Sequence, residues 1–440
     1  MKAERPTARL WYMASVLSLV NAVGFVDRQS LPLLVLQIEH DLQLSDTEMS
    51  LLIGLAFILV FSGMAVPAGM LADRVNRRKL IAGAVALFAT ATICCAAAFS
   101  FLTLFIGRMA VGIGESVNGP GGISMIRDAF PRQWQASAVG IWAMGATIGS
   151  AFALLGGGAL LALVRDAAEI HLPLIGTIHA WQLVLIASGL VTYPVAALVL
   201  TVREPQRPPR RADEAARTMR DALRFLGRHW HLFVPLLLVN GLTIMMGIGF
   251  AVWMPALLGR VWHLSRPEIG LKFGLIFLLC SPTSQFAAGF IVDKLERMGI
   301  EAVIPKFGLI VCAIVFLPAI LAPNAPSLGW LWLLLAIFLL FNTSLFTIGT
   351  ALVTKVVPPD LSGKISAFHF FIVGVCGTAI APTLIAVVSD NFYAGPAAIG
   401  HAMALVAGAL DVAAMACFAM LWGVLRGAGA QDYLTSPAAR

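Results

Sequence analysis

Residues 69–80 read GMLADRVNRRKL, and apolar runs of more than twenty residues lie on both sides of them, at 49–71 and 81–105. One aspartate and four basic residues fall within the seven positions 73–79. A short charged connection between two apolar helices is typical of a cytoplasmic loop in a multispanning membrane protein, because Lys and Arg are retained on that side. The stretch therefore predicts a membrane protein and fixes one point of its topology.

A weaker copy of this loop lies at residues 289–297, which read GFIVDKLER. The glycine, the aspartate, the cation after it and the later arginine all recur at one constant offset. Retention of basic residues inside the cell would explain either loop alone. Two copies half a chain apart favour an internal duplication, which is common among transporters.

The composition points to lipid as the main solvent of the chain. Of its 440 residues, 59% are hydrophobic and only 12% are charged, whereas a soluble globular chain is about a quarter charged. The net charge of +7 comes from short connections between apolar runs, which favours anionic lipid over nucleic acid as the counter-charge. The six cysteines have no metal-ligand or disulfide spacing, and no catalytic motif is present. We therefore expect no metal, no cofactor and no enzymatic activity.

Spanning helices need about 20 apolar residues each, and a window of that size finds twelve of them. The expected fold class is an all-α membrane protein of twelve transmembrane helices in two pseudo-symmetric six-helix bundles. The expected domains are an N-terminal bundle (1–202), a cytoplasmic basic linker (203–229), a C-terminal bundle (230–425) and a cytoplasmic tail (426–440). Residues 218–225 are expected to form a short basic helix on the membrane surface. The predicted spans are 10–37, 46–72, 80–99, 101–127, 134–164, 180–201, 230–258, 267–292, 302–322, 328–356, 365–388 and 397–425.

The orientation follows from the distribution of Lys and Arg. With the N-terminus in the cytoplasm, twenty-four basic residues fall in inside segments and four in outside segments. Because basic residues concentrate on the cytoplasmic side, we predict that both termini and the linker are cytoplasmic. Close helix packing by small residues is expected at the glycines of span 134–164, namely Gly140, Gly145, Gly149 and Gly156 to Gly158.

Four charged residues stand out inside the first and fourth predicted spans, where an ionised group at mid-bilayer costs at least about 2.5–3.5 kcal/mol and therefore suggests a function. Asp27 and Arg28 lie in the first span, and Arg108 and Glu115 in the fourth. We expect Asp27 and Glu115 to carry protons, Arg108 to contact the substrate head group, and Arg28 to orient these groups. A purely structural ion-pair cluster that holds the two helices together is the alternative.

Milder polar residues within the spans are candidates for the remaining substrate contacts. Each of them is also compatible with an interhelical hydrogen bond. Pro120 and the glycines around it predict local unwinding just past Glu115. No role is assigned to Asp411, which is alone in the last span. The candidate substrate-binding residues of this milder kind are Asn21, Asn240, Asn342 and His369.

The repeated loop and the twelve spans in two halves resemble the major facilitator superfamily. The Asp27-Arg28 pair, the stretch RMAVGIGE (108–115) and the sequence DAFP (128–131) resemble the spinster-like branch. Asn76 stands where the family usually has glycine. The resemblance implies alternating access, in which Asp73 and Arg77 form a cytoplasmic latch to Arg127 and the eleventh span. The full set of expected latch residues is Gly69, Asp73, Arg74, Arg77, Arg127, Asp293 and Arg297.

These observations predict a secondary active, proton-coupled transporter in a bacterial inner membrane. The resemblance implies a small amphiphilic solute, anionic or zwitterionic and similar to a lysophospholipid or sphingolipid. We expect a monomer whose partners are this solute, protons and the bilayer, with no nucleic acid. Alternatives are a proton symporter of small organic acids, a multidrug efflux protein and, from another class, a non-transporting receptor or scaffold.

Overall fold

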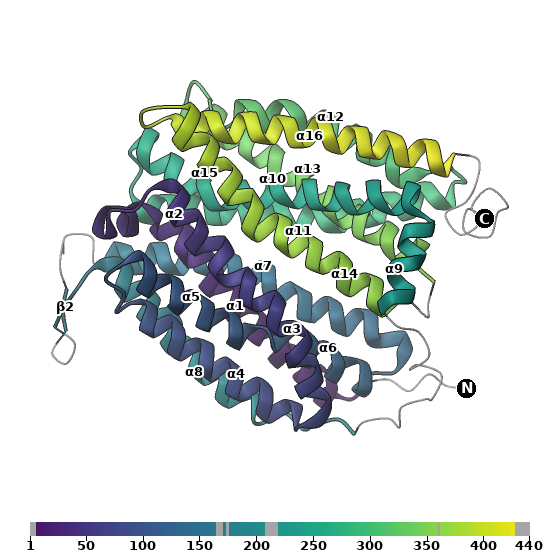
Figure 1. The fold of residues 1–440 in the computed structure, drawn as a ribbon, viewed down its shortest axis with the longest axis horizontal. Helices are drawn as coiled ribbons and strands as arrows, with labels where there is room; N and C mark the ends of the chain where they lie inside the picture. Colours follow the sequence, from purple (N-terminus) through teal and green to yellow (C-terminus); the bar gives the residue numbers. More distant parts are fainter. Residues whose placement is uncertain (1–5, 164–169, 173–175, 207–218, 359–360, 427–440) are drawn as a thin grey trace. The chain divides into compact units, whose positions relative to one another are not determined.

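The computed structural model describes residues 6–163, 170–172, 176–206, 219–358 and 361–426, and most of these residues are helical (Figure 1). They group into two compact units. Unit 1 comprises residues 1–208 and 258–278, and unit 2 comprises residues 209–257 and 279–440. The end of α10 and the first part of α11 therefore belong to unit 1, although most of both helices belongs to unit 2. The domain division at residues 203–229 stays a prediction.

Unit 1 is built around a long first helix. Helix α7 packs along α1. Helix α4 packs against both α5 and α8 (Figure 1). The helices of this unit are α1 (Ala8–Leu42), α2 (Asp46–Ser50), the π-helical segment η1 (Leu51–Leu55), α3 (Ala56–Arg74), α4 (Arg77–Cys95), α5 (Phe101–Glu115), α6 (Asn118–Ala129), α7 (Arg132–Leu163) and α8 (Ala180–Val199).

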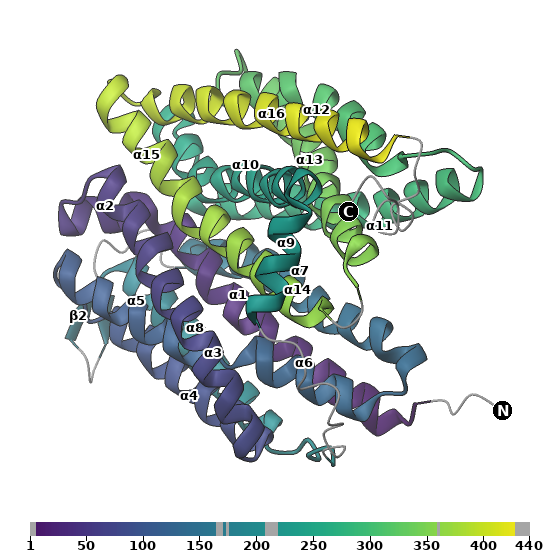
Figure 2. The same cartoon turned by 45° about the vertical axis from the view of Figure 1, so that its right-hand side comes forward.

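Unit 2 repeats this kind of packing with its own helices. The last helix, α16, lies side by side with α12, which also packs on α13 (Figures 1 and 2). The helices that lie wholly or partly in this unit are α9 (Met219–Arg228), α10 (Trp230–Trp262), α11 (Arg266–Arg297), α12 (Val303–Leu321), α13 (Leu328–Val356), α14 (Ser362–Gly374), the π-helical segment η3 (Val375–Ile380), α15 (Ala381–Phe392) and α16 (Ala398–Leu425).

The predicted all-α membrane fold is confirmed. Eleven helical stretches among the described residues are long and apolar enough to cross a membrane. The predicted fourth span is the exception, because it divides into α5 and α6 at residues 116–117, just after Glu115. The division lies where the sequence predicts unwinding, but Ser116 and Val117 keep right-handed helical backbone angles, so the helix is interrupted and not unwound. The surface helix expected at 218–225 is found as α9, at Met219–Arg228.

The only strands among the described residues form a small hairpin before α8. Its strands β1 (Ile170–Leu172) and β2 (Gly176–Ile178) pair antiparallel, with His171 opposite Thr177. Both strands lie between the predicted spans 134–164 and 180–201, so they fall outside the predicted helices.

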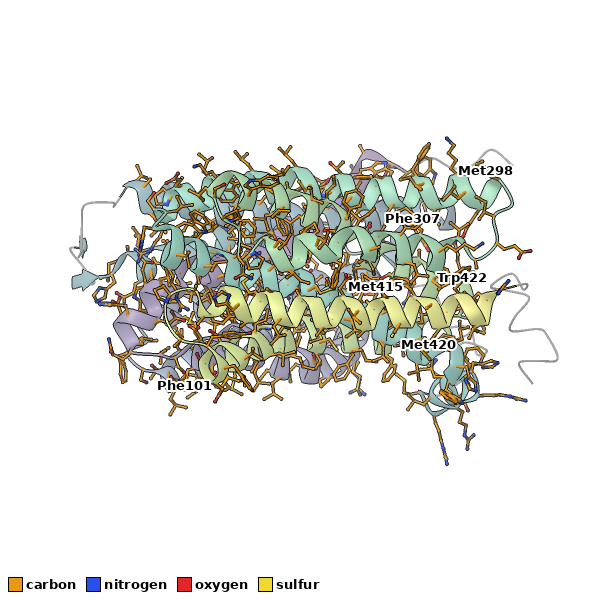
Figure 3. The ribbon with its side chains drawn as sticks, turned by 90° about the horizontal axis from the view of Figure 1, so that it is seen from above. Phe101, Met298, Phe307, Met415, Met420 and Trp422 are labelled. Carbon is orange, nitrogen blue, oxygen red and sulfur yellow. The ribbon has the colours of Figure 1, made fainter. Side chains whose placement is uncertain are left out.

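Large apolar side chains cover much of the outer surface. Phe286 on α11 is 74% exposed and Phe152 on α7 is 66% exposed. On α16, Met420 and Trp422 are also exposed, and Figure 3 shows both of them near the C-terminal end of this helix. A soluble monomer would not expose so much contiguous apolar surface, so these helices face lipid.

Two glycines let the backbones of α7 and α1 meet. A Cβ atom added at Gly145 would lie 3.1 Å from the amide nitrogen of Ala22, and one added at Gly149 would lie 2.8 Å from the Cα atom of Ala22. Added at Gly140 or Gly156, it would meet nothing within 4 Å. Gly157 and Gly158 are also close to neighbouring helices, since an added Cβ atom would lie 3.0 Å from the Leu33 side chain on α1 and 3.1 Å from the Gly270 Cα atom on α11, respectively. The predicted small-residue packing on α7 therefore holds at four of its glycines but not at Gly140 or Gly156.

Candidate functional site

The buried charges of unit 1 form two ion pairs between α1 and α5. The first joins Asp27 and Arg108, whose side chains are 3% and 2% exposed. The Nη1 atom of Arg108 donates to Oδ2 of Asp27 at 2.6 Å, and the Thr92 hydroxyl on α4 donates to Oδ1 at 2.7 Å. Both carboxylate oxygens of Asp27 are thus satisfied, which is what a charged group needs when it is taken out of water.

The second pair joins Arg28 and Glu115, and it is less symmetric. The Nε and Nη2 atoms of Arg28 both donate to Oε2 of Glu115, at 2.9 and 2.6 Å. The other oxygen, Oε1, is buried and has no hydrogen-bond partner among the described residues. The Arg28 side chain is 25% exposed and that of Glu115 only 3%. An incoming group can therefore reach Arg28 before it reaches Glu115.

The close approach of α1 to Glu115 depends on a glycine. A Cβ atom at Gly24 would lie 3.0 Å from Oε2 of Glu115, the oxygen that binds Arg28. Because Gly24 lies one turn before Arg28 on α1, the helix leaves room for the carboxylate and then supplies its cation. The local break between α5 and α6 follows Glu115 directly.

Three aromatic rings surround the Arg28 guanidinium. Its central carbon lies 4.8 Å from the ring centre of Phe25, 4.5 Å from that of Phe57 and 5.0 Å from that of Phe61. Each such contact stabilises a cation by roughly 0.5–1 kcal/mol at exposed sites and more when it is desolvated. These rings offer Arg28 an environment that tolerates its charge even when its carboxylate partner is neutral.

Asn21 belongs to the same face of α1, two turns before Arg28. Its amide Nδ2 donates to the backbone carbonyl of Trp142 on α7 at 3.0 Å, and its Oδ1 accepts from Nδ2 of Asn118 on α6 at 3.3 Å. The sequence analysis named Asn21 but neither Asn118 nor Trp142. Nothing in their sequence context separates them from ordinary helix residues, and the two helices had to be placed before their contacts appeared.

The candidate residues of unit 2 are deeply buried. Asn240 on α10 donates to the carbonyl of Leu236 at 2.8 Å and accepts from Thr350 on α13 at 3.3 Å. In the opposite direction, Asn342 on α13 donates to the carbonyl of Thr243 on α10 at 3.5 Å. These two asparagines thus link α10 to α13, and a role for them in substrate binding stays a prediction.

Two further titratable groups of unit 2 are buried. His369 on α14 is 1% exposed, and its Nε2 atom has no hydrogen-bond partner among the described residues. Asp411 on α16 is fully buried, and its carboxyl group lies beside the Cys312 thiol on α12. The structure therefore locates Asp411 inside unit 2 but shows no cation beside it in the described residues.

A third cluster lies at the start of α4, in the loop with which the sequence analysis began. Arg77 is 3% exposed, and its Nη1 atom donates to Oδ2 of Asp128 at 2.5 Å. Its Nε and backbone N–H donate to Oε1 of Glu204, at 3.2 and 3.0 Å, and the Arg78 N–H donates to Oε2 at 2.9 Å. Glu204 therefore caps the N-terminus of α4, where a carboxylate is stabilised.

The environment of Glu204 changes its acidity. Burial raises the pKa of this carboxyl. The backbone N–H groups of Arg78 and Arg77 and the Arg77 guanidinium lower the pKa by more than burial raises it, so it lies below the usual 4.5. Glu204 falls within the predicted basic linker (203–229). A carboxylate that follows a span by a few residues was the available signal, but its partner could not be chosen from sequence.

The other expected latch residues are only partly described. Gly69 lies near Pro120, since a Cβ atom added there would be 3.8 Å from the Pro120 Cβ atom. Arg74 is exposed, and Arg127 is 71% exposed with its Nε 3.7 Å from Oδ1 of Asp128. The side chains of Asp73, Asp293 and Arg297 lie outside the described residues, so their part in a latch stays a prediction.

Comparison with known proteins identifies the family of the whole chain. Residues 17–382 match the Major Facilitator Superfamily. An MFS-type efflux pump of Mycolicibacterium smegmatis is 26% identical over 421 residues, which cover 93% of this chain and 92% of that protein. Protein spinster of Drosophila melanogaster is 23% identical over 395 residues, which cover 86% of this chain and 62% of that protein.

A solved structure has the same fold. It is that of a bacterial homologue of the human lysosomal transporter Spinster, in an inward-facing and unoccupied conformation. The TM-score is 0.78 at 23% sequence identity, and the match covers 99% of this chain and 98% of the other. The predicted likeness to the spinster-like branch is therefore found in both sequence and fold.

Proposed function

Because the chain belongs to the major facilitator superfamily and is a membrane transporter, we propose that it couples the movement of protons to that of a small anionic or zwitterionic amphiphile by alternating access. The supporting observation is the unequal burial of the Arg28–Glu115 pair. Arg28 is the partly exposed member, and Glu115 is buried behind it with one oxygen free. This arrangement lets an anion and a proton be bound at the same pair.

Binding of an anionic head group to Arg28 weakens the bond between Arg28 and Glu115. A buried carboxylate that loses its cation is costly to keep ionised, so it takes up a proton. The three phenylalanines keep Arg28 in place while its partner is neutral. Release of the anion reverses both steps, and the movement of solute is thereby linked to the movement of a proton.

In this proposal the Asp27–Arg108 pair acts after the Arg28–Glu115 pair. Arg28, and not the more buried Arg108, makes the first contact with the head group, because Arg108 is occupied by Asp27. Glu115 is the first proton acceptor, since it has a free oxygen, whereas both oxygens of Asp27 are hydrogen-bonded. Asp27 and Arg108 respond after the outer pair has separated.

Flux into proteoliposomes under an imposed pH gradient tests this function, with lysophosphatidic acid, lysophosphatidylcholine and small organic acids as solutes. Glu115→Gln is expected to bind solute but to lose pH-driven accumulation, and Arg28→Ala is expected to lose binding. Glu268→Gln on α11 is the matched control, because its carboxylate is exposed beside Lys272. Accumulation that still follows the pH gradient in the Asp27→Asn, Glu115→Gln double variant would contradict the coupling.

Multidrug efflux is the second candidate, and the similarity to the mycobacterial efflux pump over 93% of the chain favours it. The same flux assay separates the two functions. Accumulation of uncharged or cationic dyes, unaffected by Arg28→Ala, would support efflux, because such solutes have no need of the guanidinium. We further propose a bacterial inner-membrane location with both termini in the cytoplasm, supported by the distribution of basic residues.

A further inference from the structure

Three helices of unit 1 meet at a small polar cluster. It lies nearer to the N-terminus of α1 than the two charged pairs do. Its members are Asn21 on α1, Asn118 and Gly122 on α6, and Trp142 on α7. Asn21 precedes Arg28 by seven residues, which corresponds to about 10 Å along the helix axis and the same face. Asn118 follows Glu115 by three residues, across the break between α5 and α6. The cluster therefore continues the charged site toward the first turns of α1.

The hydrogen bonds of the cluster fix the direction of each amide. The Trp142 carbonyl can only accept, so Asn21 offers its Nδ2 to it. The Oδ1 atom of Asn21 must then accept, and Asn118 offers its own Nδ2 at 3.3 Å. This leaves Oδ1 of Asn118 as the acceptor at the end of the chain. That atom is buried and has no hydrogen-bond partner among the described residues.

A buried donor without a partner lies beside this acceptor. The indole Nε1 of Trp142 also has no hydrogen-bond partner among the described residues. Both atoms lie close to the bare Cα of Gly122, since a Cβ atom added there would lie 3.4 Å from Trp142 Nε1 and 3.8 Å from Asn118 Oδ1. The side chain of Leu17 lies 3.8 Å from the same position. One donor and one acceptor thus lie near the same position beside Gly122.

Polar atoms that are buried without partners are uncommon, because each one loses its hydrogen bonds to water. A hydroxyl group is the smallest group that can satisfy both atoms, since it accepts from Trp142 and donates to Asn118. We propose that Asn118, Gly122 and Trp142 form a subsite for a hydroxyl group of the substrate. This inference rests on the proposed function, because the solute that brings the hydroxyl is the one whose ionised head group Arg28 holds.

The subsite narrows the substrate class to solutes with a free hydroxyl near an anionic group. Lysophospholipids and hydroxylated organic acids share that chemistry. Uncharged hydrocarbons and simple cations do not. A site that needs a hydrogen bond rejects an analogue without the hydroxyl, since the analogue leaves the donor and the acceptor unpaired.

Competitive binding to the purified full chain in lipid nanodiscs tests the subsite. The probes are two matched pairs, namely lysophosphatidic acid with its 2-deoxy analogue and gluconate with 2-deoxygluconate. The pair that the protein discriminates identifies the source of the hydroxyl. The wild-type protein should prefer the hydroxylated member of one pair by at least about ten-fold, because the hydroxyl makes two hydrogen bonds, each of which contributes about 1 kcal/mol. Trp142→Phe and Asn118→Leu should each reduce this ratio to about one.

The chain offers a matched pair of glycine variants. Gly122→Ala places a methyl group between the donor and the acceptor at ordinary contact distance, so the helix is kept while the hydroxyl is excluded. Gly119→Ala is on the same helix and meets nothing within 4 Å, so it should retain the wild-type ratio. Thermal unfolding of each variant confirms that it is folded.

The outcomes separate the two proposals. Equal affinity for both members of each pair, with pH-driven flux intact, would overturn the subsite alone and indicate an ordered water at Gly122. A preserved hydroxyl preference without any pH dependence of flux would overturn only the proton coupling. Failure of the wild-type protein to bind either pair would overturn the substrate class and the subsite together.

Discussion

Replacement of Gly149 by alanine should separate α7 from α1. The added Cβ atom would overlap the carbonyl oxygen of Ala22, its nearest neighbour, and would lie 2.8 Å from the Cα atom of Ala22, whereas non-bonded carbon atoms rest about 3.5 Å apart or more. The helices must therefore move apart by at least about 0.7 Å, because the obstacle is backbone and cannot rotate away. Overpacking of this kind typically destabilises a protein by about 1–3 kcal/mol.

The same movement should disturb the polar cluster next to it. Asn21 neighbours Ala22, and its hydrogen bond to the Trp142 carbonyl is 3.0 Å long. An added separation of about 0.7 Å brings that distance to about 3.7 Å, beyond the range of a hydrogen bond. We therefore expect Gly149→Ala to lose substrate affinity as well as stability.

Equilibrium unfolding of the purified protein in mixed micelles measures the first effect, and binding of the hydroxylated probes measures the second. Gly156→Ala is the matched control on the same helix, since its Cβ atom meets nothing within 4 Å. It should unfold like the wild type or be slightly more stable, because alanine favours a helix over glycine. If Gly149→Ala and Gly156→Ala proved equally stable, the close contact of α7 with α1 would be wrong.

Three further predictions concern charge. Glu204→Gln should destabilise the protein at neutral pH. Because the pKa of Glu204 in the folded state lies below 4.5, the loss of stability relative to wild type should persist above pH 4.5 and shrink as the pH falls through the folded pKa. A loss that grew on acidification would contradict the capping role. Asp27→Asn leaves Arg108 without a counter-charge and should cost about 3–5 kcal/mol in the same unfolding assay, part of which Arg108→Met should restore in the double variant; a single variant as stable as the double one would argue against the pair. In a background without native cysteines, an impermeant thiol reagent should label Gln43→Cys on intact cells but Asp213→Cys only after permeabilisation, and the opposite pattern would reverse the topology.

The number and limits of the helices could be read from the sequence. Eleven of the predicted spans are found as single membrane-length stretches, and the fourth is broken where its proline and glycines predict. The physical reason is that lipid offers the backbone no hydrogen bonds. Each apolar run must therefore satisfy its own backbone as a helix, whatever the rest of the chain does.

The sequence by itself also determined which residues carry charge inside the membrane, but not how they pair. Arg28 is bound to Glu115, and Arg108 to Asp27. Either acid could have met either base, since partner choice depends on how far each helix is rotated and how deep it lies. Within a membrane those variables are set by close packing of side chains, without a hydrophobic effect between the helices.

Close packing between helices also decided two further features that the sequence left open, namely which glycines meet a neighbouring helix and which residues bind Asn21. Gly149 meets the backbone of α1 and Gly156 meets nothing, although both are glycines of one helix. The partners of Asn21 come from segments about a hundred residues away. Spans and their charges are local properties of the chain, whereas the contacts that make a binding site are set only when the helices pack.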